Sequence, residues 1–399
     1  MVSKKLVVAA VLAAVIQAGS ISAYAQGNYT TTRLGGQTRI ETSVKIANNY
    51  SNSSKVQAVV VATAENFPEA LVGSTLASKN KAPVLLVRKT VQDSQSTIDY
   101  IRDNLRSGGV VYLLGDNNSV SSEVESAIKS SGSFSIKRLA GVNEDDTLRL
   151  INNEVGVSQG TPVFVASNSD FPDALSASGI AAIKGYPIIL GSKAGLSASA
   201  IDTLRSIKPS MVYILGGALV MPDTVVNDIM NNTGLSANKV IRLSGQDRYD
   251  TSLAIVKYFN ISTKNAVIAS GDNFPDALAG SSLAAKENAP IILLGSDASR
   301  QKAYLKSAGI NNLTFLGGDL VMTSAKMDSL ITDTPPAQQT PVVQPTQPTN
   351  STPDTVVQPT QPTSTSQSQG SSWSDSMRNH QSGKNGGGFD TDTDSHIHN

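Results

Sequence analysis

Short apolar runs alternate with amphipathic stretches along most of the chain, and this alternation predicts strands and helices in turn. Ala58–Ala62, Ala82–Val87 and Val110–Leu114 are apolar runs bounded by polar residues, which is typical of buried strands. The stretches with helical spacing that follow these runs are Phe67–Ser78, Val91–Leu105 and Ser119–Ser130. The first third of the chain therefore predicts an alternating α/β unit.

The same order of runs occurs twice more. The later strands are predicted at Val163–Ala166, Ile188–Leu190, Val212–Leu215, Ala266–Ala269, Ile291–Leu294 and Leu313–Leu316. Near-continuous apolar strands separated by helices indicate parallel sheets covered on both faces. We therefore expect the α/β class, with three tandem doubly wound parallel-sheet domains. Ligands of such sheets favour the carboxyl ends of the strands.

The segment F-P-[DE]-A-L marks the repetition most clearly. It begins at Phe67, Phe171 and Phe274, a step of roughly 100 residues, which is the size of a small domain rather than of a solenoid repeat. Proline and an acidic residue suit the first turn of a helix, where no N–H partner is lost and negative charge meets the helix dipole. A threefold chain disfavours a single catalytic centre.

The chain ends differ from the repeats. Lys4 and Lys5, the apolar run Leu6–Val15 and the cleavage pattern Ala23-Tyr24-Ala25 predict a secretory signal peptide. From Pro335 the composition becomes rich in Pro, Thr, Gln and Ser, which predicts an extended linker and then a disordered tail. The predicted limits are 1–25 for the signal peptide, 26–131, 132–235 and 236–334 for the three repeats, 335–370 for the linker and 371–399 for the tail.

Composition excludes several kinds of site. The chain has no cysteine, and its three histidines, His380, His396 and His398, all lie in the tail. The repeats thus lack the commonest general base and most transition-metal ligands, so we expect no catalytic residues, no metal and no cofactor. The 32 basic and 32 acidic residues balance, unlike the basic excess of nucleic-acid-binding proteins. No segment after the signal peptide has the apolar length of a membrane helix.

Four motifs follow one another in each repeat, in full or with single substitutions. They are R-[LI]-x-G-x-x-R-[YI]-[ED]-T, fullest at Arg242–Thr251, then N-F-P-D-A-L, then A-P-[IV]-[IL]-L, then a strand closing on L-G-G. Over roughly residues 33–332 they resemble the cell wall binding repeat 2 family of Gram-positive, clostridial-type surface proteins. The resemblance implies a pseudo-threefold assembly that attaches non-covalently to the cell wall by holding an anionic secondary wall polymer. With the predicted signal peptide and the lack of histidine and cysteine in the repeats, we expect a secreted, non-enzymatic protein of the cell wall or cell surface.

Two arginine positions are candidates for polymer contact. Arg33, Arg138 and Arg242 recur in every repeat, where a shared structural ion pair is the main alternative. Arg39 and Arg248 recur in two repeats, and the second repeat has Glu144 at that place. Arginine suits bidentate recognition of phosphate or carboxylate. If this second arginine contacts the polymer, repeat two should contribute least.

The A-P-[IV]-[IL]-L runs are also candidates, because the resemblance implies that they are binding elements. Their apolar character favours a scaffold role, in which each strand positions the polar loop that follows. The residues concerned are Pro83, Leu85, Leu86, Pro187, Ile189, Leu190, Pro290, Ile292 and Leu293.

Two rival functions stay open at this point. A wall-active hydrolase would need a catalytic pair, for which Asp272 and Asp276 are the candidates, although no basic partner accompanies them in all three repeats. A structural surface-layer component would use the tail to bind other surface proteins. No G-x-x-x-x-G-K-[ST] or G-x-G-x-x-G motif follows a strand, so nucleotide binding has no support.

Overall fold

Three parallel sheets of four strands form the framework of the computed structural model, which describes residues 23–26, 28–273 and 275–332. We call each sheet with its helices a module. The first sheet has the order β4-β3-β5-β6. Its strands are β3 (Val56–Thr63), β4 (Val84–Val87), β5 (Leu105–Leu114) and β6 (Ser135–Leu139), and its helices are α2 (Pro68–Lys79), α3 (Gln95–Asn104) and α4 (Ser122–Ser130).

The second sheet repeats this order as β8-β7-β9-β10. Its strands are β7 (Val163–Ser167), β8 (Ile188–Gly191), β9 (Val212–Leu215) and β10 (Val240–Leu243), and its helices are α6 (Phe171–Lys184), α7 (Ala198–Ile207) and α8 (Asp223–Thr233). The predicted α/β class with three doubly wound parallel sheets is confirmed, and the apolar strand runs lie where their pattern predicted them.

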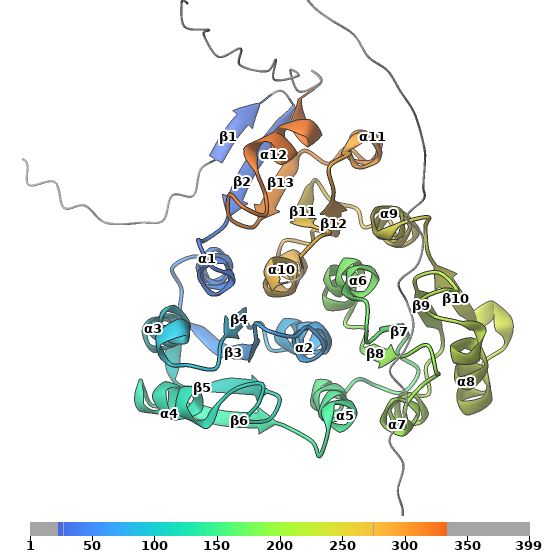
Figure 1. The fold of residues 1–399 in the computed structure, drawn as a ribbon, viewed down its shortest axis with the longest axis horizontal. Helices are drawn as coiled ribbons and strands as arrows, with labels where there is room; N and C mark the ends of the chain where they lie inside the picture. The colour runs from blue at the N-terminus through green and yellow to red at the C-terminus, as the bar shows by residue number, and fades with distance from the viewer. Residues whose placement is uncertain (1–22, 27, 274, 333–399) are drawn as a thin grey trace, which may run out of the picture. The chain divides into compact units, whose positions relative to one another are not determined.

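The third sheet is completed by the start of the chain. β2 pairs in parallel with β13, so the order is β2-β13-β11-β12, with β1 added antiparallel at the outer edge of β2. The strands are β1 (Ala23–Gln26), β2 (Tyr29–Leu34), β11 (Asn265–Ser270), β12 (Ile291–Leu294) and β13 (Asn312–Leu316), and the helices are α10 (Pro275–Lys286), α11 (Ser299–Ala308) and α12 (Ser324–Ile331). The two ends of the repeat region thus meet in one sheet (Figure 1).

Sheet boundaries and sequence repeats are therefore offset from each other. The strand that carries each R-L motif belongs to the preceding module in the ring, and the helix after it crosses to the next module. These crossing helices are α1 (Arg39–Ser51), α5 (Glu144–Val155) and α9 (Arg248–Phe259). Each packs on the central helix of the preceding module, α1 on α10, α5 on α2 and α9 on α6.

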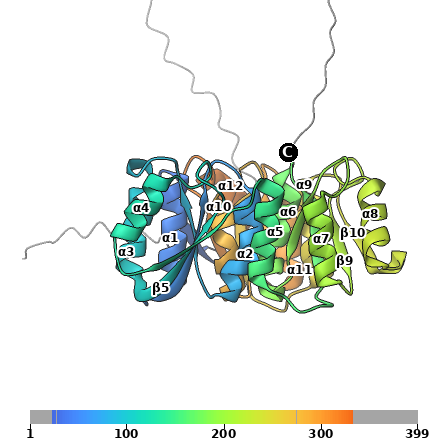
Figure 2. The same cartoon turned by 90° about the horizontal axis from the view of Figure 1, so that it is seen from below.

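The central helices α2, α6 and α10 pack on one another around the pseudo-threefold centre (Figure 1). Small side chains allow the close approach, and two of them bond across it. Thr75 Oγ1 donates to the Tyr186 oxygen at 3.0 Å, and Ser78 Oγ donates to the Ala182 oxygen at 2.7 Å. One apolar cluster runs through all three modules, so burial of apolar surface joins the modules as well as filling each one. Figure 2 shows α2, α5 and α7 running side by side.

The fourth strand of each sheet was not predicted. β6 and β10 lie at sheet edges, and β2 has only the short strand β1 outside it. All three carry few buried residues, and in β2 only Thr31 and Leu34 are buried. Their polar sequences lack the apolar run that marks a central strand.

The three predicted terminal segments lie partly or wholly outside the described residues: 1–22 of the signal peptide, the linker 335–370 and the tail 371–399. The predicted cleavage pattern Ala23-Tyr24-Ala25 falls in β1. Within the described ranges, every helix is too short or too polar to cross a membrane.

Candidate functional site

The arginine that recurs in all three repeats anchors the glycine-rich turn of the preceding module. Arg33 donates to the backbone oxygens of Gly317 at 3.1 Å and Met322 at 2.6 Å, and it pairs with Asp319. Arg138 and Arg242 make the equivalent bonds to the turns at Gly115 and Gly216. These arginines hold the turns in place, and contact between them and a ligand stays a prediction.

The second arginine lies where two modules meet. We define junction 3–1 as the place where α1 packs on α10, junction 1–2 as that of α5 on α2, and junction 2–3 as that of α9 on α6. Arg39 is the first residue of α1, and its Nη1 donates to the Ala64 oxygen at 2.7 Å. Arg248 is the first residue of α9 and donates to the Gly271 oxygen at 2.8 Å. Its guanidinium lies 5.9 Å from the centre of the Phe171 ring.

A buried acid from the F-P-[DE]-A-L segment lies beneath each junction arginine. At junction 3–1, burial raises the pKa of Asp276 to about 6, although a hydrogen bond with Thr42 and the charge of Arg39 act to lower it. At junction 2–3, burial raises the pKa of Asp173 to about 6, opposed by Thr251 and, less strongly, by Arg248. The acid of one repeat and the arginine and threonine of the next therefore form one unit.

The turn glycine faces this acid and has no room for a side chain. Gly317 has φ +118°, and a Cβ atom there would lie 2.9 Å from Asp276 Oδ2. Gly216 has φ +97°, and its Cβ would lie 2.5 Å from Asp173 Oδ2. Positive φ and close approach both require glycine, so the L-G-G turn serves the junction.

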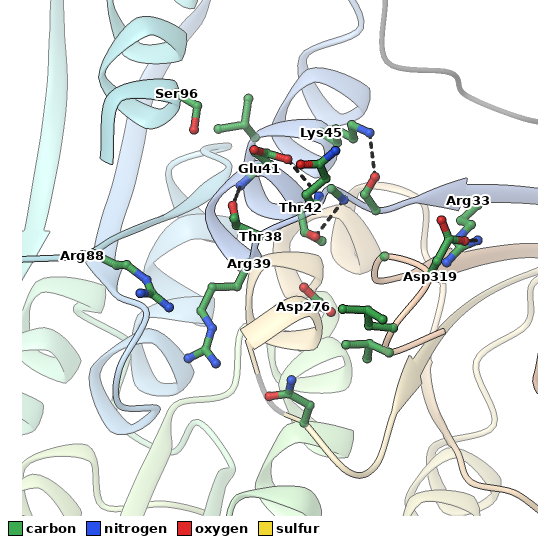
Figure 3. A pocket seen from close by; sticks show the side chains of 18 of the residues that line it. Arg33, Thr38, Arg39, Glu41, Thr42, Lys45, Arg88, Ser96, Asp276 and Asp319 are labelled. Atoms are coloured by element: carbon green, nitrogen blue, oxygen red, sulfur yellow. Dashed lines mark hydrogen bonds and ion pairs between the residues drawn. The ribbon is translucent and has the colours of Figure 1, made fainter. Parts of the chain in front are cut away.

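Junction 3–1 opens into a cleft of about 1630 Å³ (Figure 3). Arg39 and Arg88 project into it, and Lys45 lies on its α1 wall, where Nζ donates to the Gly35 oxygen at 2.6 Å. Four acids also line the cleft. Asp319 pairs with Arg33, Glu41 accepts from the Gln37 N–H at 2.8 Å, and Asp99 pairs with Arg102 outside the lining. Arg88 in turn pairs with Glu65. The cleft thus offers basic groups at the carboxyl ends of the third sheet.

Junction 1–2 is built from different residues. Glu144 is the first residue of α5, at the place of Arg39 and Arg248, and it accepts a hydrogen bond from Asn66 Nδ2 at 3.3 Å. The acid below it is Glu69 of α2, which is 5% exposed. Two carboxylates therefore meet where the other junctions have an arginine and a carboxylate.

The A-P-[IV]-[IL]-L residues are buried in β4, β8 and β12 or directly before them. Leu85, Leu86, Ile292 and Leu293 are 0% exposed. The prolines also belong to the scaffold, since their carbonyl oxygens accept from the neighbouring strands β3, β7 and β11. Burial favours the scaffold role, and direct ligand contact by these residues stays a prediction.

The sequence reasoning missed a polar network in the third module. The Tyr249 hydroxyl donates to Asp272 Oδ1 at 2.8 Å, and Lys326 Nζ lies 3.1 Å from Asp272 Oδ2. Burial and then the bond to Asp272 raise the pKa of Tyr249 to about 12. The other modules bury Val124 and Val225 at the position of Lys326. A lysine at an otherwise apolar position was the sequence signal from which this network could have been predicted.

Comparison with known proteins adds the following. The family model described as cell wall binding domain 2 (CWB2) matches residues 33–125, 138–226 and 242–326. The N-acetylmuramoyl-L-alanine amidase LytC of Bacillus subtilis is 28% identical over 288 residues, which span 71% of this chain and 55% of the amidase. The amidase enhancer of B. subtilis is 27% identical over 306 residues, 75% of this chain and 40% of the enhancer.

Two solved structures also match the chain. Cwp6 from Clostridium difficile matches with a TM-score of 0.66 and 25% identity, over 79% of this chain and 50% of Cwp6. Cwp8 from the same organism matches in fold with a TM-score of 0.66 at 24% identity, over 75% of this chain and 51% of Cwp8. The chain spans about half the length of most of these relatives.

Proposed function

The chain belongs to the cell wall binding domain 2 family and is a protein of the bacterial cell wall or cell surface, and we propose that it attaches there by binding an anionic secondary wall polymer. Binding is non-covalent and takes place at the module junctions. The observation that carries the proposal is the cleft at junction 3–1, into which the guanidinium groups of Arg39 and Arg88 project. Planar guanidinium groups suit the phosphate or carboxylate groups of such a polymer.

Repetition supplies avidity. Junctions 3–1 and 2–3 present Arg39 and Arg248 in equivalent positions, so a long polyanion can occupy both. Once one contact has formed, the second forms at a high effective concentration without any new kind of interaction. Repeat two, with Glu144, contributes least to anion binding.

A pull-down on purified walls tests this proposal. The double variant Arg39→Gln with Arg248→Gln should lose about tenfold or more in wall affinity, because two charged contacts are removed. The matched control is Arg205→Gln on α7, whose side chain is exposed and bonds to Asn232 away from the junctions. Undiminished binding to walls stripped of anionic polymer would overturn the proposal.

We further propose that the chain has no catalytic activity of its own. The pair that a hydrolase would need is engaged elsewhere, since Asp272 pairs with Lys326 and Asp276 is buried beneath Arg39. A zymogram on purified walls that showed clearing, abolished by Asp276→Asn, would contradict this. The rival in which the tail binds another surface protein is tested by comparing residues 26–334 with 335–399 in the same pull-down.

A further inference from the structure

Junction 1–2 reverses the charge of the other two junctions. Partial burial, and then the charges of Glu69 and Asp145, raise the pKa of Glu144, while the hydrogen bond from Asn66 acts to lower it. The corresponding residues of the other repeats are arginines at the place of Glu144, and Ile40 and Tyr249 at the place of Asp145. No basic side chain is among the groups that affect this pKa.

Glu69 has lost the partners that its counterparts have. Asp276 and Asp173 are bonded by Thr42 and Thr251 of the next repeat. At junction 1–2 the corresponding threonine, Thr147, donates instead to the Asn143 oxygen at 3.0 Å. Glu69 Oε1 accepts from Ser119 Oγ at 2.8 Å, which leaves Oε2 buried and without a hydrogen-bond partner among the described residues.

A buried carboxylate oxygen without a partner, next to a second carboxylate, destabilises the folded chain unless a cation or a proton compensates it. The two acids come from different modules, Glu69 from α2 and Glu144 from the start of α5. Glu144 is exposed and Glu69 Oε2 is buried, so a cationic group would have to approach Oε2 from the Glu144 side.

We propose that junction 1–2 is a subsite for an ammonium group carried by the wall polymer, with Glu69 Oε2 and the Glu144 carboxylate as acceptors. An ammonium group has three donors and needs only a few acceptors. A bare divalent metal needs more oxygen ligands, and no group of three or more potential metal-ligating side chains occurs among the described residues. This inference rests on the proposed polymer binding and adds that the polymer carries both signs of charge.

The charge pattern would then orient the polymer. Anionic groups occupy the junctions of Arg39 and Arg248, and a cationic group occupies that of Glu144. A polymer with only negative charges is repelled at junction 1–2. The second repeat, with Glu144, therefore provides specificity instead of a weaker version of the arginine contact.

The test uses the full secreted chain and glucosamine as a probe, with N-acetylglucosamine, which has no charge, as the matched probe. We expect glucosamine to bind saturably and to lower the pKa of Glu144 in carboxyl-detected NMR, and N-acetylglucosamine to do neither. Glu144→Gln and Glu69→Gln should each weaken glucosamine binding about tenfold, the effect of one charge-assisted contact. Glu123→Gln, an exposed acid at the start of α4, is the control and should change nothing.

Three outcomes would overturn the subsite: equal binding of both sugars, no difference between Glu144→Gln and Glu123→Gln, or saturation by calcium or magnesium chloride but not by glucosamine. Melting temperatures of each variant separate loss of fold from loss of binding. A wall pull-down distinguishes failure of the ammonium subsite from failure of the proposed wall attachment. If the wild-type chain binds walls and does not bind glucosamine, this inference alone fails. If it binds glucosamine and does not bind walls, the proposed function fails.

Discussion

Arg33 and Met322 stand 289 positions apart in the chain, yet Arg33 Nη2 donates to the Met322 backbone oxygen at 2.6 Å. Beside this bond, Phe315 of β13 is in register with Arg33 of β2. The start of the first repeat is therefore a structural part of the third module, and the ring of modules closes through it.

Removing the Arg33 side chain should weaken this closure. Arg33→Ala eliminates bonds to two backbone oxygens and to Asp319, and we expect a loss of about 2–4 kcal/mol in the free energy of unfolding. Chemical denaturation measures it. Arg205→Ala, which removes an exposed pair, is the control and should change stability by less than about 0.5 kcal/mol. Equal effects of the two variants would show that closure does not depend on Arg33.

Removal of the first strand should disturb the last module. A chain that begins at Gly35 lacks β2, whereas one that begins at Gln26, the predicted mature start, keeps it. Without β2 the edge of β13 is unpaired. Hydrogen exchange should show faster exchange in β13 than in β9, the corresponding strand of the second module. Uniform protection in both strands would contradict the ring closure.

Equivalent glycines of two turns should tolerate alanine differently. A Cβ atom on Gly318 would lie 2.2 Å from the Gly36 oxygen, whereas one on the corresponding Gly217 meets nothing within 4 Å. Gly318→Ala should therefore cost more than about 2 kcal/mol, because the backbone must shift. Gly217→Ala should be within about 0.5 kcal/mol of the wild type. Thermal unfolding distinguishes them, and similar melting temperatures would refute the close packing at junction 3–1.

The buried acid of junction 3–1 gives stability a defined pH dependence. With a pKa of about 6 in the folded chain and 3.8 as its usual value, Asp276 binds its proton more tightly when folded. Its ionised form therefore destabilises the fold above pH 6, and this penalty fades as the pH falls towards 4. Asp276→Asn removes the ionisation.

The comparison that checks this is the stability of the variant minus that of the wild type, measured by urea unfolding at two pH values. The difference should be about 2 kcal/mol more favourable to the variant at pH 7.5 than at pH 4.5. Subtraction cancels the other titrating groups, including Asp173, which behaves in the same way. A difference independent of pH would mean that Asp276 is not the group responsible.

Much of the fold was predictable because it depends on local pattern. Val110–Leu114 and Ile291–Leu294 are continuous apolar runs, and both are buried strands. The Phe-Pro-acid segments begin helices α2 and α6 because proline and an acid suit a first turn. Tyr29–Leu34 escaped prediction because this strand buries too few side chains to leave an apolar run.

The candidate site was predictable only in part. Repetition identified Arg39, Arg248 and Glu144 as the informative positions, since a difference between copies is visible in the sequence. It could not show that Arg33 is held by backbone oxygens of the third module, nor that Lys326 reaches Asp272. Neither contact has a local pattern.

The sequence by itself determined the three repeats, the order of their strands and helices, and the position at which the second repeat departs from the others, because each is a property of neighbouring residues. Only the tertiary structure decided which sheet is joined by the strands that carry Arg33, Arg138 and Arg242, and which side chains Glu144 meets. Asn66 and Glu144 are 78 positions apart, and the acidic junction exists only because α5 packs on α2. Contacts of that range follow from how apolar faces are buried between modules, and no segment of the sequence records them by itself.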